Sequence, residues 1–371
     1  MKVDAGIYIH VPFCEDACDY CSFYSRPLRT HGELVDPYVD RLCDEITGVL
    51  DGLAVSADTV YFGGGTPSVL GPARIERILD TVSRKTALSP KSEITLEVNP
   101  VHAVQATLLA YQSAGINRMS LGIQTFSRTG YDRIGRRGGY ADDAVLDCFF
   151  SPDVDHSVDF ISGISRDIDT VVDLRHVLPY APGHLSVYLL SIDEGTSLYN
   201  RFTPDSGHDE HQLESYRTVS AFLQDTGYEH YEVSNFARPG KRARHNEKYW
   251  TFAPYYGFGP GAHSFDGTAR YRNRPSVEDY CTGRPVREYD VRTEHDAVAE
   301  FFLTGLRRAD GVSESRFVSV FGRPFPDVIM NRCGSVQDIM VQGKKPYRTV
   351  RVDSENWPLL DTIVCDLLAV L

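Results

Sequence analysis

Three cysteines lie close together near the N-terminus: Cys14, Cys18 and Cys21. Their spacing indicates a chemistry more directly than any other feature of this chain. They lie in the run HVPFCEDACDYCSFYS, which has the pattern C-x3-C-x2-C with Tyr20 just before the third thiol. Three thiolates on one short loop can bind three irons of a 4Fe–4S cubane. The fourth iron then stays open to a bidentate amino and carboxylate group, such as the methionine end of S-adenosylmethionine (SAM).

A zinc knuckle or a chance cluster is the alternative interpretation of these cysteines. Structural zinc sites need four ligands, and no nearby pair of residues supplies the fourth. Residues this close on one loop also cannot all pair in disulfides. We expect the scattered remaining cysteines to be reduced, small hydrophobic residues: Cys43, Cys148, Cys281, Cys333 and Cys365. Since an open-iron cluster needs a reducing compartment, the expected location is the cytoplasm.

The composition restricts the classes of function. The 371 residues give room for one large domain, or for a large and a small one, and 42% hydrophobic residues support a sizeable core. A net charge of −13 argues against a general nucleic-acid surface, although a local basic patch could still bind a polyanion. The chain begins MKVDAG without a secretory pattern and has no apolar run of about 18 residues, so neither a signal peptide nor a membrane span is expected.

Short β-branched runs alternate with helical patterns through the first two thirds of the chain. Six runs are predicted to be buried strands: Ile7–Val11, Thr59–Phe62, Ile94–Val98, Arg118–Ile123, Ser157–Ile161 and Leu185–Leu190. Apolar residues at helical spacing predict helices between and after them: Tyr38–Leu50, Ala73–Val82, Ala103–Gln112, Ala141–Phe149, Thr170–Leu178 and Glu210–Leu223. This alternation predicts an α/β fold with parallel strands, as a partial (β/α)6 barrel open on one side. Ligands should gather at the carboxyl ends of the strands.

The pattern changes after about residue 228. We expect residues 1–235 to form the barrel and residues 236–275, rich in Gly, Pro, Asn and aromatic residues, to form a long functional loop. Short, weakly patterned elements predict a small α/β or helical C-terminal domain over residues 276–371.

Glycines and polar residues follow several predicted strands. The run GGGTP at residues 63–67 follows the second strand; glycines let a backbone approach a ligand and expose N–H groups, although a plain tight turn is the commoner explanation. Glu97 and Gln124 end the third and fourth strands, where a surface carboxylate and a capping amide are equally good explanations. Asp159 lies within an apolar strand, where burial without a partner is costly, so a ligand contact is plausible.

Longer runs of sequence add a family resemblance to these motifs. They are IYIHVPFC, YFGGGTPS, EVNP, GINRMSLGIQTF, HLSVYLL, YEVSNFARPGKRARHNEKYW and GFGPGAHS. In them the chain resembles the oxygen-independent coproporphyrinogen III oxidase family of the radical SAM superfamily, and within it the heme-chaperone branch. The resemblance runs from about Tyr8 to Ser264, and more weakly to the C-terminus through AEFFLTGLRR. It implies a radical SAM barrel with a 4Fe–4S cluster on the three cysteines.

The resemblance also implies a set of SAM contacts. Gly64, Gly65 and Thr66 would contact the methionine amino group of SAM, and Glu97 and Gln124 would bind its ribose hydroxyls or methionine portion. The remaining residues implied to contact the cofactor are Arg136, Asp159, Tyr8 and Tyr20. An arginine can pair with the SAM carboxylate in a bidentate manner. For the two tyrosines, a core role is an equally simple explanation.

The run HNEKYW is implied to contact heme. The imidazole of His245 is a common type of heme-iron ligand, and Tyr249 and Trp250 could cover an apolar face. The preceding basic residues could hold the two heme propionates: Lys241, Arg242 and Arg244. A basic loop that caps the barrel, followed by a helix N-terminus with a hydrophobic patch, is the simpler alternative. His263 and His10 are second choices for the ligand.

Three functions remain open: heme binding and transfer to an unknown acceptor protein, oxidative decarboxylation of coproporphyrinogen III, and radical methyl transfer. The oxidase branch carries a further cysteine where this chain has Phe23, and a longer segment than the thirteen residues that precede Cys14 here. We therefore expect a heme chaperone without coproporphyrinogen III oxidase activity. Gly138 and Ser165 also depart from the family pattern near the expected cofactor face.

Overall fold

The computed structural model describes residues 3–202, 207–283, 287–334, 339–344 and 347–369. The chain divides into two compact units. The barrel unit comprises Met1–Ser215 and Pro254–Asp290, and the second unit comprises Tyr216–Ala253 and Val291–Leu371. The segment 236–275, which the sequence predicts as one loop, is therefore divided between them at residue 253.

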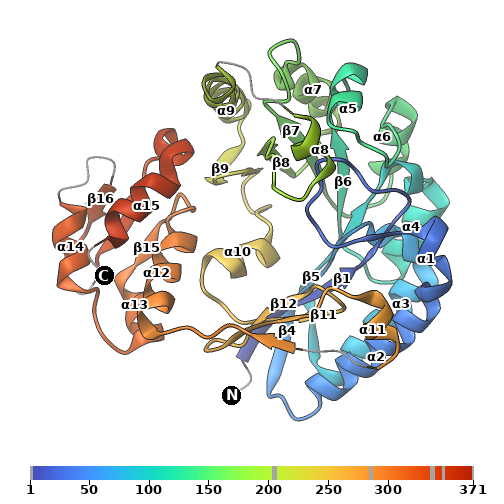
Figure 1. Cartoon of the computed structure of the whole chain (residues 1–371), viewed down its shortest axis with the longest axis horizontal. Helices are drawn as coiled ribbons and strands as arrows, with labels where there is room; N and C mark the ends of the chain where they lie inside the picture. Colours follow the sequence, from blue (N-terminus) through green and yellow to red (C-terminus); the bar gives the residue numbers. More distant parts are fainter. Residues whose placement is uncertain (1–2, 203–206, 284–286, 335–338, 345–346, 370–371) are drawn as a thin grey trace. The chain divides into compact units, whose positions relative to one another are not determined.

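The barrel unit is built on parallel strands. They are β1 (Val3–Val11), β4 (Val55–Gly64), β5 (Ala87–Val98), β6 (Arg118–Gln124), β7 (Asp155–Ser162) and β8 (His184–Leu189). They pair in this order and all in parallel, as the blue-to-green part of Figure 1 shows. Each of the six predicted strands lies in one of them or overlaps it closely. The predicted α/β class with parallel strands is confirmed.

Helices connect and flank these strands. They are α1 (Leu28–His31), α2 (Val35–Leu50), α3 (Pro72–Lys85), α4 (Gln105–Ser113), α5 (Arg128–Arg133), α6 (Asp143–Phe149), α7 (Thr170–Val177), α8 (Ser197–Arg201) and α9 (His208–Asp225). The apolar stripe that predicts α2 is buried as expected, since Val39, Leu42 and Ile46 are at most 1% exposed. Within β1, Ile7 and Ile9 are fully buried.

A further set of strands extends the sheet beyond β1. Strand β11 (Tyr255–Phe258) pairs with β1 in parallel, followed by the antiparallel β12 (His263–Phe265), β13 (Arg270–Asn273) and β14 (Arg287–Tyr289). The run GFGPGAHS thus forms a strand, a tight turn and a second strand rather than an open loop. A Cβ atom at Gly257 would lie 2.1 Å from the carbonyl oxygen of His263, so the close approach of the two strands requires glycine. Helix α11 (Val277–Cys281) lies between β13 and β14 in the sequence.

The second unit contains an antiparallel strand pair, a three-stranded antiparallel sheet and an aromatic core. Its strands are β9 (Glu229–Glu232), β10 (Asn235–Ala237), β15 (Val312–Ser313), β16 (Ile339–Gln342) and β17 (Thr349–Val352). Its helices are α10 (Arg244–Trp250), α12 (Glu294–Gly305), α13 (Glu314–Phe321), α14 (Asp327–Cys333) and α15 (Leu360–Leu368). Phe301, Phe302 and Phe317 pack edge-to-face and tilted at the centre of this unit. No helix among the described residues has the length and apolar character needed to cross a membrane.

Candidate cluster and cofactor site at the carboxyl ends of the strands

The cysteine loop follows β1 and is held by backbone hydrogen bonds at both ends. Cys14 lies in β2 (Phe13–Cys14), which pairs in parallel with β3 (Arg26–Pro27) and closes the loop. Between them, Asp19 N donates to the carbonyl oxygen of Gly135 (3.2 Å), and Leu198 N donates to the carbonyl oxygen of Asp19 (2.7 Å). The loop that carries the three thiols is therefore anchored to the segments after β6 and β8.

The three thiols lie in a half-buried environment with polar contacts. Burial raises the pKa of Cys14, although hydrogen bonds from Thr66 and Ser25 oppose the rise. Burial, with a smaller contribution from the neighbouring Cys14 and Cys18, raises the pKa of Cys21 to about 11. Because thiolates bind metal, loss of these protons needs a compensating positive charge, which iron supplies.

The cysteines are close together but do not converge on one point. Among the described residues, no group of three His, Cys, Asp or Glu side chains is arranged to hold a single metal ion. Structural zinc requires such convergence. In a cubane, by contrast, each cysteine binds a different iron, so its thiols stand apart around the cluster.

The GGGTP run packs directly against the cysteine loop. A Cβ atom at Gly65 would lie 2.6 Å from the carbonyl oxygen of Phe13 and 3.0 Å from Cys14 Sγ, so only glycine permits this approach. However, Gly65 N donates to Val11 O (2.8 Å) and Thr66 N donates to Phe13 O (2.7 Å). The expectation that these N–H groups are exposed to a ligand is wrong for these two residues. Their carbonyl oxygens and the Thr66 hydroxyl can still accept from an amino group.

The Arg136 guanidinium contacts both the cysteine loop and the end of β6, and so links two groups of the predicted cofactor residues. Its Nη1 lies 3.5 Å from Cys18 Sγ and 3.2 Å from the Tyr20 hydroxyl, and its Nη2 donates to the carbonyl oxygen of Gly122 (3.1 Å). Its Nε is buried and has no hydrogen-bond partner within the described residues. A buried guanidinium N–H without a partner is costly. The residues therefore fit a ligand with a carboxylate beside the cysteine loop.

Gln124 lies beside this guanidinium in a strained backbone conformation. Its φ is +70°, in the left-handed region that non-glycine residues rarely adopt. A Cβ atom at Gly122 would lie 3.0 Å from Gln124 Nε2 and 3.3 Å from Arg136 Nη2. Gly122 thus makes room for both polar side chains at the end of β6.

Tyr8 and Glu97 are joined through a residue that the sequence analysis missed. Tyr61 stacks on Tyr8 with ring centroids 6.3 Å apart, and its hydroxyl donates to Glu97 Oε1 (2.7 Å). Burial raises the pKa of Glu97 to about 8 despite this hydrogen bond. Tyr61 lies two residues before the GGGTP run, and that position near a strand end is the signal that could have identified it.

Asp159 already has protein partners. The Ser120 hydroxyl lies 3.0 Å from both of its carboxylate oxygens, and Ser186 on β8 also hydrogen bonds to it. Neighbouring strands therefore supply the partners that its burial requires. A SAM contact for Asp159 stays a prediction.

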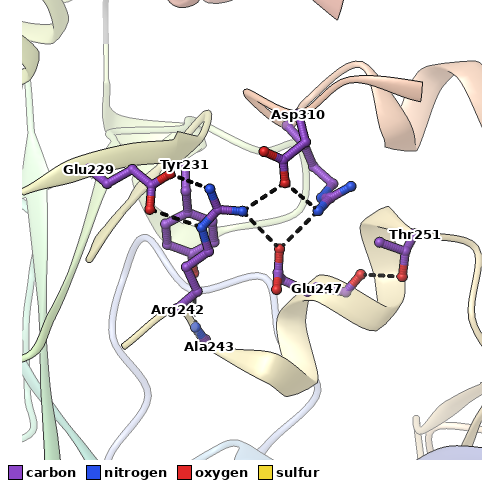
Figure 2. Close-up of polar contacts among 8 residues, drawn as sticks. Glu229, Tyr231, Arg242, Ala243, Glu247, Thr251 and Asp310 are labelled. Carbon is purple, nitrogen blue, oxygen red and sulfur yellow. Dashed lines mark hydrogen bonds and ion pairs between the residues drawn. The ribbon is translucent and has the colours of Figure 1, made fainter. Parts of the chain in front are cut away.

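The HNEKYW segment lies in the second unit, on α10. His245 is 0% exposed, and its Nε2 lies 2.8 Å from the Tyr249 hydroxyl. Figure 2 shows Arg242 among the carboxylates of Glu229, Glu247 and Asp310. Binding of iron by His245, or of a propionate by Arg242, would require these contacts to open.

The second-choice histidines also have contacts of their own. His10 is buried, with Nδ1 3.1 Å from the Tyr8 hydroxyl and Nε2 2.9 Å from the carbonyl oxygen of Tyr24. Burial lowers the pKa of His10 to about 4. His263 lies on β12 and is exposed as a residue. Partial desolvation of its ring nevertheless lowers its pKa, and the nearby Arg272 adds to this effect.

Sequence comparisons place the chain in a family. The radical SAM superfamily model matches residues 8–150. The heme chaperone HemW of Bacillus subtilis is 33% identical over 349 residues, which cover 87% of this chain and 89% of that protein. The chain belongs to the HemW family. The heme chaperone HemW of Escherichia coli is 30% identical over 335 residues, with 85% of this chain and 86% of that protein covered.

A solved structure supports the fold of this HemW-family chain. Coproporphyrinogen III oxidase (HemN) of Escherichia coli matches with a TM-score of 0.81, covering 100% of this chain and 91% of that chain at 20% identity. At that identity the likeness concerns the fold alone. It confirms the predicted radical SAM barrel with a further C-terminal part.

Proposed function

We propose that this HemW-family chain holds a 4Fe–4S cluster and SAM, binds heme and passes it to an acceptor protein. Its relatives in Bacillus subtilis and Escherichia coli carry the name heme chaperone. The observation that carries the cofactor part is the buried, unpartnered Nε of Arg136 beside the cysteine loop. The need of the thiols for a reducing environment favours the cytoplasm.

The residues predicted to hold the cluster and SAM each have a role in this proposal. Cys14, Cys18 and Cys21 would each bind one iron and leave the fourth open to the amino and carboxylate groups of SAM. Arg136 Nε would pair with the carboxylate, and the carbonyl oxygens of residues 64–66 would accept from the amino group. When reduced, such a cluster supplies one electron to the SAM sulfonium.

The remaining side chains would orient SAM and exclude water. Glu97, with a pKa of about 8, can either donate or accept a hydrogen bond near neutral pH and so suits a ribose hydroxyl. The side-chain amide of Gln124 would hydrogen bond to SAM. The rings of Tyr8 and Tyr20 would form apolar walls of the SAM site. Asp159 would contact SAM while its hydrogen bonds with Ser120 and Ser186 hold its carboxylate in place.

Iron analysis, SAM binding and heme binding test this proposal together. Anaerobically reconstituted protein is expected to bind one SAM and one heme per chain and to transfer the heme to apomyoglobin, used as a generic acceptor. Product analysis after reduction with dithionite separates the chaperone from the alternatives. Protoporphyrinogen formed at enzymatic turnover would favour the oxidase, and a protein that binds no tetrapyrrole would favour the methyltransferase.

A further inference from the structure

A series of hydrogen-bonded side chains beside the cysteine loop is used by none of the predicted roles. Ser68 Oγ lies 2.9 Å from His102 Nδ1, and His102 Nε2 lies 3.1 Å from Glu15 Oε1. Ser68 belongs to η2 (Pro67–Leu70), which follows β4, and His102 ends η3 (Pro100–His102), which follows β5. Glu15 lies in the cysteine loop itself. The three side chains therefore join the segments after β1, β4 and β5.

The same residue types occur in hydrolytic triads, but this set does not suit nucleophilic attack. In such a triad the serine hydroxyl faces the substrate while the histidine removes its proton. Ser68 is only 4% exposed, and the backbone N–H of Asn99 also donates to its Oγ (3.1 Å). An oxygen enclosed in this way has no face open to a substrate. The series is better explained by what it holds in place, which is Glu15.

The Ser68 end of the series is firmly fixed. Its carbonyl oxygen accepts from the hydroxyl of Tyr111 (2.8 Å), which is fully buried, and its Oγ accepts from Asn99 N. Because a backbone N–H can only donate, the Ser68 hydroxyl is left to donate to His102 Nδ1. The neutral imidazole then carries its proton on Nε2 and donates a hydrogen bond to Glu15. All the hydrogen bonds of the series thus run in one direction, toward the cysteine loop.

Glu15 lies in an exposed part of the cysteine loop. Residues 15–17 are exposed, whereas the three thiols are half-buried. The backbone contacts that anchor the loop lie on either side of this part, at Cys14 and at Asp19. The His102 side chain is only 20% exposed. Its contact with Glu15 therefore links the exposed part of the loop to the packed ends of β4 and β5.

We propose that His102 is a positioning residue for the 4Fe–4S cluster: with Ser68 it holds Glu15, and so the loop between Cys14 and Cys18, against the segments after β4 and β5. The inference rests on the cluster in the proposed function and adds a support that lies outside the cysteine motif. Contacts behind the ligands of a metal site keep those ligands in place and so affect how firmly the metal is held. Without the His102 contact, the exposed part of the loop would open more often, and a chelator would reach the iron.

Release of iron from anaerobically reconstituted, full-length protein to the chelator bathophenanthroline tests this role. His102→Ala is expected to release iron roughly three- to fivefold faster than the wild type, the effect of losing one partly exposed hydrogen bond to a charged group. His102→Gln retains an amide N–H that can donate to Glu15 and should restore most of the wild-type rate. His102→Asn can accept from Ser68 but is too short to reach Glu15, and should be as fast as His102→Ala. A residue that served stability alone would not separate these two amides.

Changes at the other end of the contact complete the test. Glu15→Ala should accelerate iron release as much as His102→Ala, and the double variant should be no faster than either one, because both remove the same contact. His176→Ala removes the ring of an exposed pair with Asp143 (2.7 Å) elsewhere in the barrel unit and should leave the rate unchanged. A wild-type rate in His102→Ala or Glu15→Ala, additive effects in the double variant, or equal rates in the glutamine and asparagine variants would overturn the inference. A wild-type protein that retains no iron would instead remove the proposed cluster.

Discussion

The cysteine end of the barrel and the α10 segment both carry residues that the sequence links to a cofactor. They differ in how far the hydrogen-bonding capacity of their charged groups is already used within the protein. At the cysteine end, Arg136 retains a buried N–H that has no partner among the residues that the structure describes. On α10, Arg242 is surrounded by three carboxylates and His245 is bonded to Tyr249. The two regions therefore differ in the state of their charged groups, while the Trp250 indole N–H of α10 is, like Arg136 Nε, buried without a partner among the described residues.

The largest effect is expected from the cysteines of the barrel end. Reconstituted wild-type protein should carry about four irons per chain, and the triple change of Cys14, Cys18 and Cys21 to Ala should remove essentially all of them. Cys365→Ala, which alters an exposed cysteine outside the motif, should keep the full iron content. Normal cluster absorbance in the triple variant would show that the cluster assignment is wrong.

The next largest effect concerns Arg136. Arg136→Ala should weaken SAM binding by roughly 10- to 150-fold, the equivalent of about 1.5–3 kcal/mol for a charged hydrogen bond. Arg136→Lys should recover only part of this, because an ammonium group cannot pair in a bidentate manner. Isothermal titration calorimetry measures both, with Arg77→Ala on the outer face of α3 as the control. Equal SAM affinities in all four proteins would contradict the assignment.

Arg242 tests the other side of the comparison. Because its guanidinium joins Glu229, Glu247 and Asp310, Arg242→Ala should lower the free energy of unfolding by on the order of 1 kcal/mol and leave heme affinity unchanged. Thermal denaturation and heme titration of the same sample separate the two effects. A weaker heme complex with unchanged stability would support the sequence-based propionate contact.

The last expected effect is a pH dependence of stability at Glu97. Its pKa is 4.5 in the unfolded chain and about 8 in the folded protein, so between these values the folded form keeps a proton that the unfolded form has lost. Stability therefore falls as pH rises from about 5 to 8. Glu97→Gln removes this loss, and its Tm relative to the wild type should rise across that range. A constant Tm difference would argue against the raised pKa.

Local patterns were enough to predict the barrel. The six parallel strands each contain a short, mostly apolar run, and the cysteine loop and the GGGTP run follow strand ends, where a parallel sheet gathers loop residues at one edge. These features depend on residues close in sequence. The prediction of six parallel strands therefore agrees with the structure.

Contacts between distant segments could not be predicted in the same way. Asp310 meets Arg242 across 68 residues, and no periodicity signals that pairing. The N–H groups of Gly65 and Thr66 are used by carbonyl oxygens of the cysteine loop, which the run GGGTP does not reveal. The strands within 254–275 were likewise hidden by glycines and a proline that resemble loop composition.

Heme titration of the anaerobically reconstituted wild-type chain, followed through the Soret band, tests the central claim most directly. The account predicts saturation at one heme per chain with a dissociation constant at or below about 1 μM, equivalent to about −8.2 kcal/mol. Subsequent addition of apomyoglobin should withdraw that heme. A protein with a complete cluster and bound SAM whose spectrum shows no heme binding would contradict the assignment as a heme chaperone.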